Sequence, residues 1–230
     1  ASRGSTQVSP IIDGAQTKTA STPTPSQLTP KPGSSAPPLT GPVEPSALQL
    51  VDASKLPKGV GIKPPATRIL IPDIGVDSRV TYLRTVWEDG IFVWETPKWS
   101  VGHMTGTANP GEAGNVVMTG HISSPIRGEG SVFKRLPEIP KLLDSGWKVD
   151  IILYTSEEKY LYRVISTKVI TPEQVDIMAT TQDPVLTLIT CVPDFVYDKR
   201  LIVTAKLIAK APLEQTPPPC AADNPYCNEP

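Results

Sequence analysis

The chain has 230 residues, with 22 basic and 23 acidic side chains and a formal net charge of −1. It has no clustered Lys/Arg block, which excludes nucleic-acid binding through phosphate neutralisation. No window approaches the roughly 18 consecutive apolar residues that span a bilayer, and no charged segment followed by an apolar segment opens the given sequence.

The first 65 residues have the composition of a tether rather than of a domain. They hold 12 of the 27 prolines and no Trp, Tyr or Phe. Without aromatic or periodic aliphatic residues, such a segment cannot offset the conformational entropy of ordering. We therefore expect residues 1–65 to form a largely disordered Pro/Ser/Thr-rich tether, in which residues 48–62 could fold over the following domain as a cover.

Short β-strands dominate the pattern from residue 66 to residue 211. Eight segments are rich in β-branched and aromatic residues and are bounded by Gly, Pro or Asp. They cover residues 68–71, 76–83, 91–94, 115–119, 148–154, 160–170, 185–190 and 200–208. Helical signals are limited to one or two turns in residues 131–143, broken at Pro137 and Pro140, and a single turn at 172–176. Eight strands with so little helix predict an antiparallel barrel or sandwich.

Residues 212–230 form a proline-rich tail with two of the three cysteines. Polar and turn residues separate Cys220 from Cys227, so a small disulfide loop is expected in an oxidising compartment, with free thiols as the alternative. Neither histidine is near in sequence, and no second cysteine pair completes a tetrahedral set. The pattern therefore argues against a metal site in the tail.

The third cysteine, Cys191, follows the apolar strand 185–190. Taken alone, a cysteine at such a place is more often a small core residue than a nucleophile. However, Arg200 begins the next strand and His121 ends the run that starts at residue 115. If these strands are neighbours, a thiol, an imidazole and a guanidinium can lie at the same end of the barrel.

These three groups suit acyl transfer. An imidazole can take the proton of a thiol and then protonate a leaving amine. A fixed guanidinium can stabilise the tetrahedral oxyanion. The alternatives are a surface turn for His121 and an ordinary ion pair for Arg200. We expect a packing role for His103 and a solvated turn for Glu112.

Three segments resemble signatures of the sortase family. Thr119-Gly120-His121 is similar to its TGH motif, Thr187-Leu188-Ile189-Thr190-Cys191 to its TLxTC motif, and Arg200-Leu201-Ile202-Val203 to its RLxV motif. The resemblance extends over residues 65–211. It implies an all-β fold, an eight-stranded sortase-type β-barrel with one or two short helices, and cysteine transpeptidase activity.

The resemblance also implies roles for individual residues. Cys191 would attack an amide of a C-terminal sorting signal and form a thioacyl intermediate, with His121 as general acid and base and Arg200 at the oxyanion. Thr190 matches a family position that contacts the signal peptide or helps to shape the oxyanion site. An amine from a peptidoglycan precursor or a pilin-like protein would then resolve the intermediate.

The loop of residues 192–199 is short and contains Pro193, a pattern closer to class D to F or pilin-joining sortases than to the calcium-stimulated class A. No metal or other cofactor is expected. The family resemblance implies the extracellular face of a bacterial plasma membrane, with membrane contact only through an anchor preceding Ala1. A hydrolytic cysteine peptidase of the same fold and a non-catalytic surface-binding barrel are the alternative functions.

Overall fold

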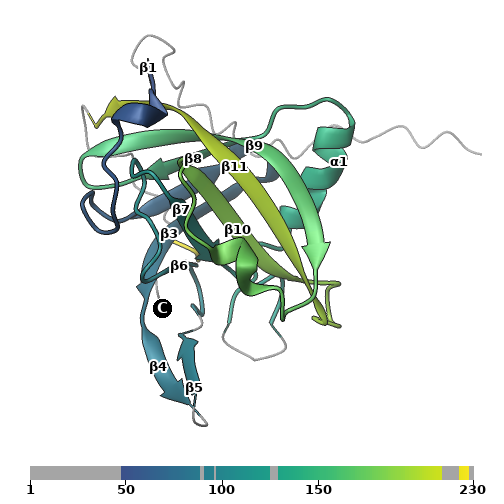
Figure 1. Ribbon diagram of the computed structural model, residues 1–230. Helices are drawn as coiled ribbons and strands as arrows, with labels where there is room; N and C mark the ends of the chain where they lie inside the picture. Colours follow the sequence, from purple (N-terminus) through teal and green to yellow (C-terminus); the bar gives the residue numbers. More distant parts are fainter. Residues whose placement is uncertain (1–47, 89–90, 96, 125–128, 214–222, 228–230) are drawn as a thin grey trace, which may run out of the picture. The chain divides into compact units, whose positions relative to one another are not determined.

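The computed structural model describes residues 48–88, 91–95, 97–124, 129–213 and 223–227, and its main feature is a β-barrel (Figure 1). The barrel strands are β2 (Arg68–Ile71), β3 (Val76–Leu83), β6 (Val101–Met104), β7 (Asn115–Thr119), β8 (Asp150–Tyr154), β9 (Glu158–Ile170), β10 (Val185–Val192) and β11 (Lys199–Pro212). They pair in the order β11-β10-β7-β6-β3-β2-β8-β9, and β9 also pairs with β11, which closes the ring. The predicted eight-stranded barrel is confirmed. Residues 1–47 of the expected tether and Cys220 lie outside the described residues.

Two of the pairings in this ring are parallel. β3 runs parallel to β6, and β7 runs parallel to β10. The antiparallel barrel expected from the sequence is wrong for these two pairs. Parallel neighbours need a long connection, and here residues 84–100 join the first pair while β8 and β9 separate the second. Strand composition alone does not encode this choice of neighbour.

Seven of the eight predicted segments are barrel strands, but residues 91–94 are not. They form β5 (Ile91–Trp94), which pairs with β4 (Thr85–Glu88) in a separate hairpin that projects from the barrel (Figure 1). The eighth barrel strand is β6, whose Val-Gly-His-Met sequence lacks a strand pattern. Its glycine is needed because a Cβ at Gly102 would lie 2.5–2.8 Å from side-chain atoms of Leu83.

Helical structure is limited to short pieces in the described residues. The α-helix α1 (Ile139–Asp144) follows the 3-10 turn η4 (Leu136–Glu138). Pro140 stands in the first turn of α1, where its missing N–H is not needed, so it begins this helix rather than breaking it. The turn expected at residues 172–176 is found slightly later, as η5 (Val175–Met178). None of the helices in these ranges has the length and apolar character that crossing a membrane requires.

The strands β10 and β11 have two apolar faces. Leu186 and Leu188 of β10 belong to the large cluster that fills the barrel. Ile189 alternates with them and belongs, with Ile202 of β11, to a second buried cluster. Because neighbouring strand residues point to opposite faces, the second cluster lies on the outer face of the sheet. Side chains of η5 pack against it.

Residues 48–66 are docked on the barrel. The sequence predicted a largely disordered tether up to residue 65. β1 (Gln49–Leu50) pairs with Lys210 and Ala209 near the end of β11. Arg200 lies at the other end of the same strand. β1 therefore docks on the barrel at the end of β11 away from Arg200.

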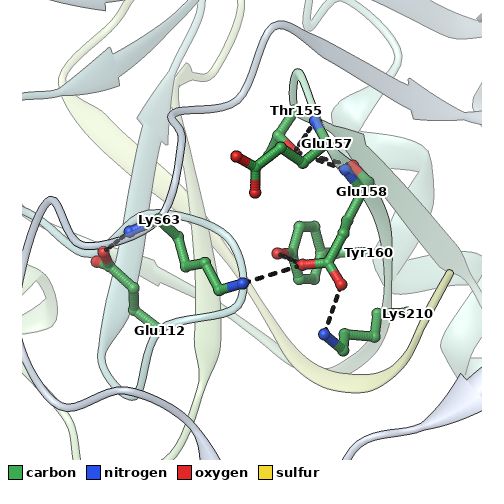
Figure 2. Close-up of polar contacts among 7 residues, drawn as sticks. All are labelled: Lys63, Glu112, Thr155, Glu157, Glu158, Tyr160 and Lys210. Carbon is green, nitrogen blue, oxygen red and sulfur yellow. Dashed lines mark hydrogen bonds and ion pairs between the residues drawn. The ribbon is translucent and has the colours of Figure 1, made fainter. Parts of the chain in front are cut away.

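A buried carboxylate fixes the docked segment. Glu112 is fully buried and accepts backbone N–H groups from Gly61 (3.2 Å), Ile62 (2.5 Å), Lys63 (2.7 Å) and Asn109 (2.7 Å). Figure 2 shows this carboxylate beside the backbone of Lys63. The solvated turn expected for Glu112 is wrong, because residues distant in sequence cover it.

A second carboxylate ties the same segment to the end of β11. Glu158 accepts hydrogen bonds from Lys63 Nζ (3.3 Å), Lys210 Nζ (2.5 Å) and the Tyr160 hydroxyl (2.5 Å) (Figure 2). Burial alone would raise the pKa of Glu158, but the hydrogen bonds from Lys210 and Tyr160 outweigh it and hold the pKa below its usual value. The carboxylate is therefore kept in its charged form.

Candidate active site

The three candidate catalytic residues come from adjacent strands. β10 lies between β7 and β11 in the barrel. Because β7 is parallel to β10, both strands end at the same edge of the sheet, and the antiparallel β11 begins there. His121 follows β7, Cys191 lies in β10, and Arg200 lies at the start of β11. All three are at that edge.

Cys191 and Arg200 are direct partners across the β10–β11 ladder. Directly opposed residues project from the same face, with Cβ atoms roughly 4.5–5.5 Å apart. By alternation from Ile189 and Ile202, that face is the outer one. The thiol is free and partly exposed. The expectation that the two strands are neighbours is confirmed.

The Arg200 side chain is anchored by the loop that precedes it. Its Nη1 donates to the carbonyl oxygens of Tyr197 (2.9 Å) and Lys199 (3.0 Å). A guanidinium carries donors on three nitrogens in a planar fork. It can therefore be held through one nitrogen and still present donors to a substrate oxyanion.

His121 follows the end of β7 in a tightly packed turn. The Gly120 N–H donates to the carbonyl of Ile189 on β10 (3.2 Å), and the Phe133 N–H donates to the carbonyl of His121 (2.8 Å). A Cβ at Gly120 would lie 2.6 Å from Val132 and 2.8 Å from Phe133. Gly120 thus lets the segment pass close to residues 132–133 and directs the chain past the Cys191 strand.

A carboxylate that the sequence did not single out lies beside His121. Glu129 Oε2 is 3.7 Å from His121 Nε2, and the two side chains are 13% and 22% exposed. The separation is too long for a hydrogen bond but close enough for an ion pair when the imidazole is protonated. Ser124 Oγ donates to the same carboxylate oxygen at 2.5 Å. Glu129 follows His121 by eight residues, and this spacing does not by itself indicate a catalytic pair. No sequence pattern therefore identified Glu129.

Thr190 is placed between the cysteine and histidine segments. It is buried, and its hydroxyl donates to the carbonyl of Gly120 (2.9 Å). This bond joins the residue before Cys191 to the residue before His121. The structure therefore gives Thr190 a role in holding the two segments together, in addition to the contact with the signal peptide or the shaping of the oxyanion site that the family resemblance implies.

The loops that follow His121 and Cys191 are also joined. The Ser123 hydroxyl contacts the Asp194 carboxylate and the Tyr197 hydroxyl, the latter at 2.6 Å. Phe195 and Tyr197 have positive φ values of 66° and 62°, which non-glycine residues adopt at some cost. The contact with Ser123 helps to hold this loop, and through the Tyr197 carbonyl it holds Arg200.

A cavity of about 600 Å³ opens beside these loops. Its lining includes Ile122, Val192 and Pro193, which follow His121 or Cys191 by one or two residues in the chain. Lys134, Asp194 and Lys199 also line it. The volume falls in the range of ligand-binding pockets. His121, Cys191 and Arg200 are not among the described residues that line it, so the cavity adjoins the candidate site without containing these three groups.

His103 lies apart from this group. It is fully buried, its Nε2 is 3.0 Å from the carbonyl oxygen of Ala108, and Tyr82 contacts its ring edge-on. Burial lowers the pKa of His103 to about 4. A neutral, enclosed imidazole matches the expected packing role.

In the described ranges, no three side chains of the His, Cys, Asp and Glu types gather in a way that could hold a metal ion.

Comparison with known proteins identifies the family of the chain. The sortase-domain family model matches residues 69–208, which is more than half of the chain. The chain therefore belongs to the sortase family, whose members are transpeptidases that act on sorting signals at the cell surface. No curated protein is similar enough in sequence to count as a match.

The chain is similar to solved sortase structures, and one with a TM-score above 0.5 supports the shared fold. The SrtA sortase from Actinomyces oris is 23% identical with a TM-score of 0.51, covering 77% of this chain and 98% of that one. A lid mutant of sortase A from Corynebacterium diphtheriae is 24% identical, with a TM-score of 0.49 and coverage of 64% and 72%. Sortase A from Listeria monocytogenes is 22% identical, with a TM-score of 0.49 and coverage of 66% and 93%.

Proposed function

We propose that this protein is a cysteine transpeptidase that cleaves a C-terminal sorting signal of surface proteins and transfers the acyl part to an amine. The observation that carries the proposal is the cross-strand pair of Cys191 and Arg200, with His121 at the same edge on the adjoining strand. A thiol, an imidazole and a guanidinium at one sheet edge are the groups that thiol-based acyl transfer needs.

The reaction proceeds in two balanced halves. His121 accepts the proton of the Cys191 thiol as the sulfur attacks the scissile carbonyl carbon, and Arg200 donates hydrogen bonds to the resulting oxyanion. When the C–N bond breaks, His121 protonates the leaving amine and a thioacyl bond to Cys191 remains. An incoming amine then attacks that carbonyl and loses a proton to His121, and the C–S bond breaks as His121 returns this proton to the Cys191 sulfur.

The accepting amine belongs to a peptidoglycan precursor or to a pilin-like protein, and the enzyme works at the extracellular face of the bacterial plasma membrane. This part of the proposal follows from family membership. The short β10–β11 loop containing Pro193 favours a class D to F or pilin-type enzyme.

A peptide library incubated with and without an added amine tests the proposal. Products that carry the amine, formed by the native protein and absent with Cys191→Ala, are expected. If the products were only free acids, the hydrolytic peptidase would replace the transpeptidase. If no peptide were cleaved and a thiol-reactive probe failed to label folded Cys191, a non-catalytic binding barrel would replace both.

A further inference from the structure

The C-terminal segment of residues 223–227 lies outside the family-matched range and is bound to the barrel. Asn224 Nδ2 donates to the Asp77 carbonyl (2.9 Å) on β3. The Tyr226 carbonyl accepts the Arg79 N–H (3.0 Å) and the Ser78 hydroxyl (3.3 Å). These bonds fix the backbone of the segment along β3.

The Tyr226 side chain reaches from this segment to residues 130–131. Its hydroxyl accepts the Ser131 N–H (3.2 Å) and lies 3.3 Å from the Ser131 hydroxyl. Its ring centroid is 6.5 Å from that of Trp99. Gly130 lies against both rings, because a Cβ there would be 2.7 Å from Tyr226 and 2.8 Å from Trp99. Tyr226 thus packs directly on the backbone at residue 130.

The segment held by Tyr226 contacts His121 at both of its ends. Glu129, which precedes Gly130, places a carboxylate oxygen 3.7 Å from His121 Nε2. Phe133, two residues after Ser131, donates its N–H to the His121 carbonyl. Among the described residues, Nε2 of His121 is enclosed and has no hydrogen-bond partner. The Glu129 carboxylate is therefore suited to orient the ring and to pair with the imidazolium that forms during proton transfer.

We propose that Tyr226 is a positioning residue of the transpeptidation site, which acts by holding Glu129 against His121. The proposal rests on the proposed function for its catalytic consequence. Its structural content is independent of the reaction: the docked C-terminal segment sets the surroundings of one imidazole.

The test uses the full chain with Tyr226→Phe, Glu129→Gln and their double variant. Tyr226→Phe keeps the ring and removes only the hydroxyl that bonds to Ser131. Tyr154→Phe is the control for the loss of a tyrosine hydroxyl from another strand, β8, where the ring packs with Arg68. The chain has only two histidines, so NMR resolves the imidazole signals of His121 and His103 without ambiguity.

Tyr226→Phe and Glu129→Gln are both expected to shift the His121 imidazole signals and to leave those of the buried His103 unchanged. Transfer of a peptide selected by the native protein to hydroxylamine should lose roughly tenfold in kcat, with KM within about twofold, because misplacement of a catalytic group slows chemistry more than binding. Glu129→Asp should recover part of the rate. The double variant should be no slower than Glu129→Gln, since both changes act through the same carboxylate.

A lowered melting temperature with unchanged His121 signals and unchanged kcat would overturn the proposal, as would additive effects in the double variant. If the native protein formed no thioacyl adduct with any peptide, the proposed function would fail instead. The histidine spectra would still decide whether Tyr226 positions the Glu129–His121 contact.

Discussion

Cys191 and Arg200 face each other across one rung of the β10–β11 ladder, on the outer face of the barrel. The register of an antiparallel pair fixes this relationship, so it does not depend on the flexible geometry of a loop. Thr190, one residue earlier, points to the other face and holds the carbonyl that precedes His121. One strand thus presents the proposed nucleophile on one side and, from the other, supports the segment of the proposed general acid and base.

Replacement of the Arg200 fork should slow the chemical step. Arg200→Lys retains the charge but loses the planar donor geometry. We expect kcat for peptide transfer to hydroxylamine to fall by about 10²- to 10³-fold, the usual effect of losing an oxyanion donor. Arg163→Lys, which alters a guanidinium paired with Asp150, is the control and should stay within about twofold. Equal rates in the two variants would contradict the role of Arg200.

Thr190→Val should separate the support of His121 from general stability. The change removes the bond to the Gly120 carbonyl while nearly conserving shape, and should lower the free energy of unfolding by about 1 kcal/mol. Thr187→Val on the same strand removes a comparable buried bond to Asn115 (2.8 Å). Both variants should lose similar stability in urea unfolding, but only Thr190→Val should slow acylation of Cys191. Equal slowing by both would mean that stability, not positioning, is responsible.

Glu112→Gln should loosen the N-terminal segment without affecting the site. Its carboxylate accepts four backbone N–H groups. Loss of a charged acceptor from a buried site lowers the free energy of unfolding by roughly 1–3 kcal/mol. Hydrogen exchange at residues 61–63 should accelerate, while alkylation of Cys191 by iodoacetamide keeps its rate. Glu138→Gln removes an exposed ion pair with Arg135 and should change stability by less than about 1 kcal/mol. Unchanged exchange in Glu112→Gln would refute the anchoring role.

Glu158 should make stability depend on acidity. Its pKa is lower in the folded protein than the ordinary value, because the Lys210 and Tyr160 hydrogen bonds outweigh the effect of burial. A depressed folded pKa stabilises the protein above the unfolded pKa of about 4.3, and that contribution is lost as the pH falls through the folded pKa. Urea unfolding at a series of pH values should show a smaller loss below about pH 4.3 for Glu158→Gln than for the native chain. Parallel curves would contradict this assignment.

His103 should remain neutral over the working range of the enzyme. Burial lowers its pKa to about 4, well under the ordinary value of about 6.5. NMR titration of the imidazole signals from pH 8 to about 5.5 should leave the His103 signal in place, because that interval lies above the folded pKa. A titration midpoint of the His103 signal near pH 6.5 would instead show that water reaches the buried ring.

The sequence predicted those parts of the fold whose pattern is local. Strands such as 76–83 and 115–119 carry their own β-branched composition, and both are found as predicted. β6 was not predicted because its Val-Gly-His-Met sequence has little strand propensity. Its glycine is instead required by the close contact with the Leu83 side chain. The projecting β5 was assigned to the barrel because strand composition does not identify the partner of a strand.

The residues of the candidate site also differ in whether the sequence could identify them. His121, Cys191 and Arg200 stood at strand junctions, and their chemistry together with the family motifs was enough to single them out. Glu129 and Tyr226 could not be found this way, because their contacts with the His121 region depend on packing between distant segments. The solvated turn predicted for Glu112 was wrong for the same reason, since three of its four partners lie about fifty residues earlier.

Intact-protein mass spectrometry during turnover of a selected sorting peptide tests the nucleophile most directly. The account predicts an adduct equal to the acyl fragment, mapped to Cys191 by digestion, discharged by hydroxylamine and absent from Cys191→Ala. Cleavage of the same peptide by Cys191→Ala, or an adduct on another residue, would contradict it.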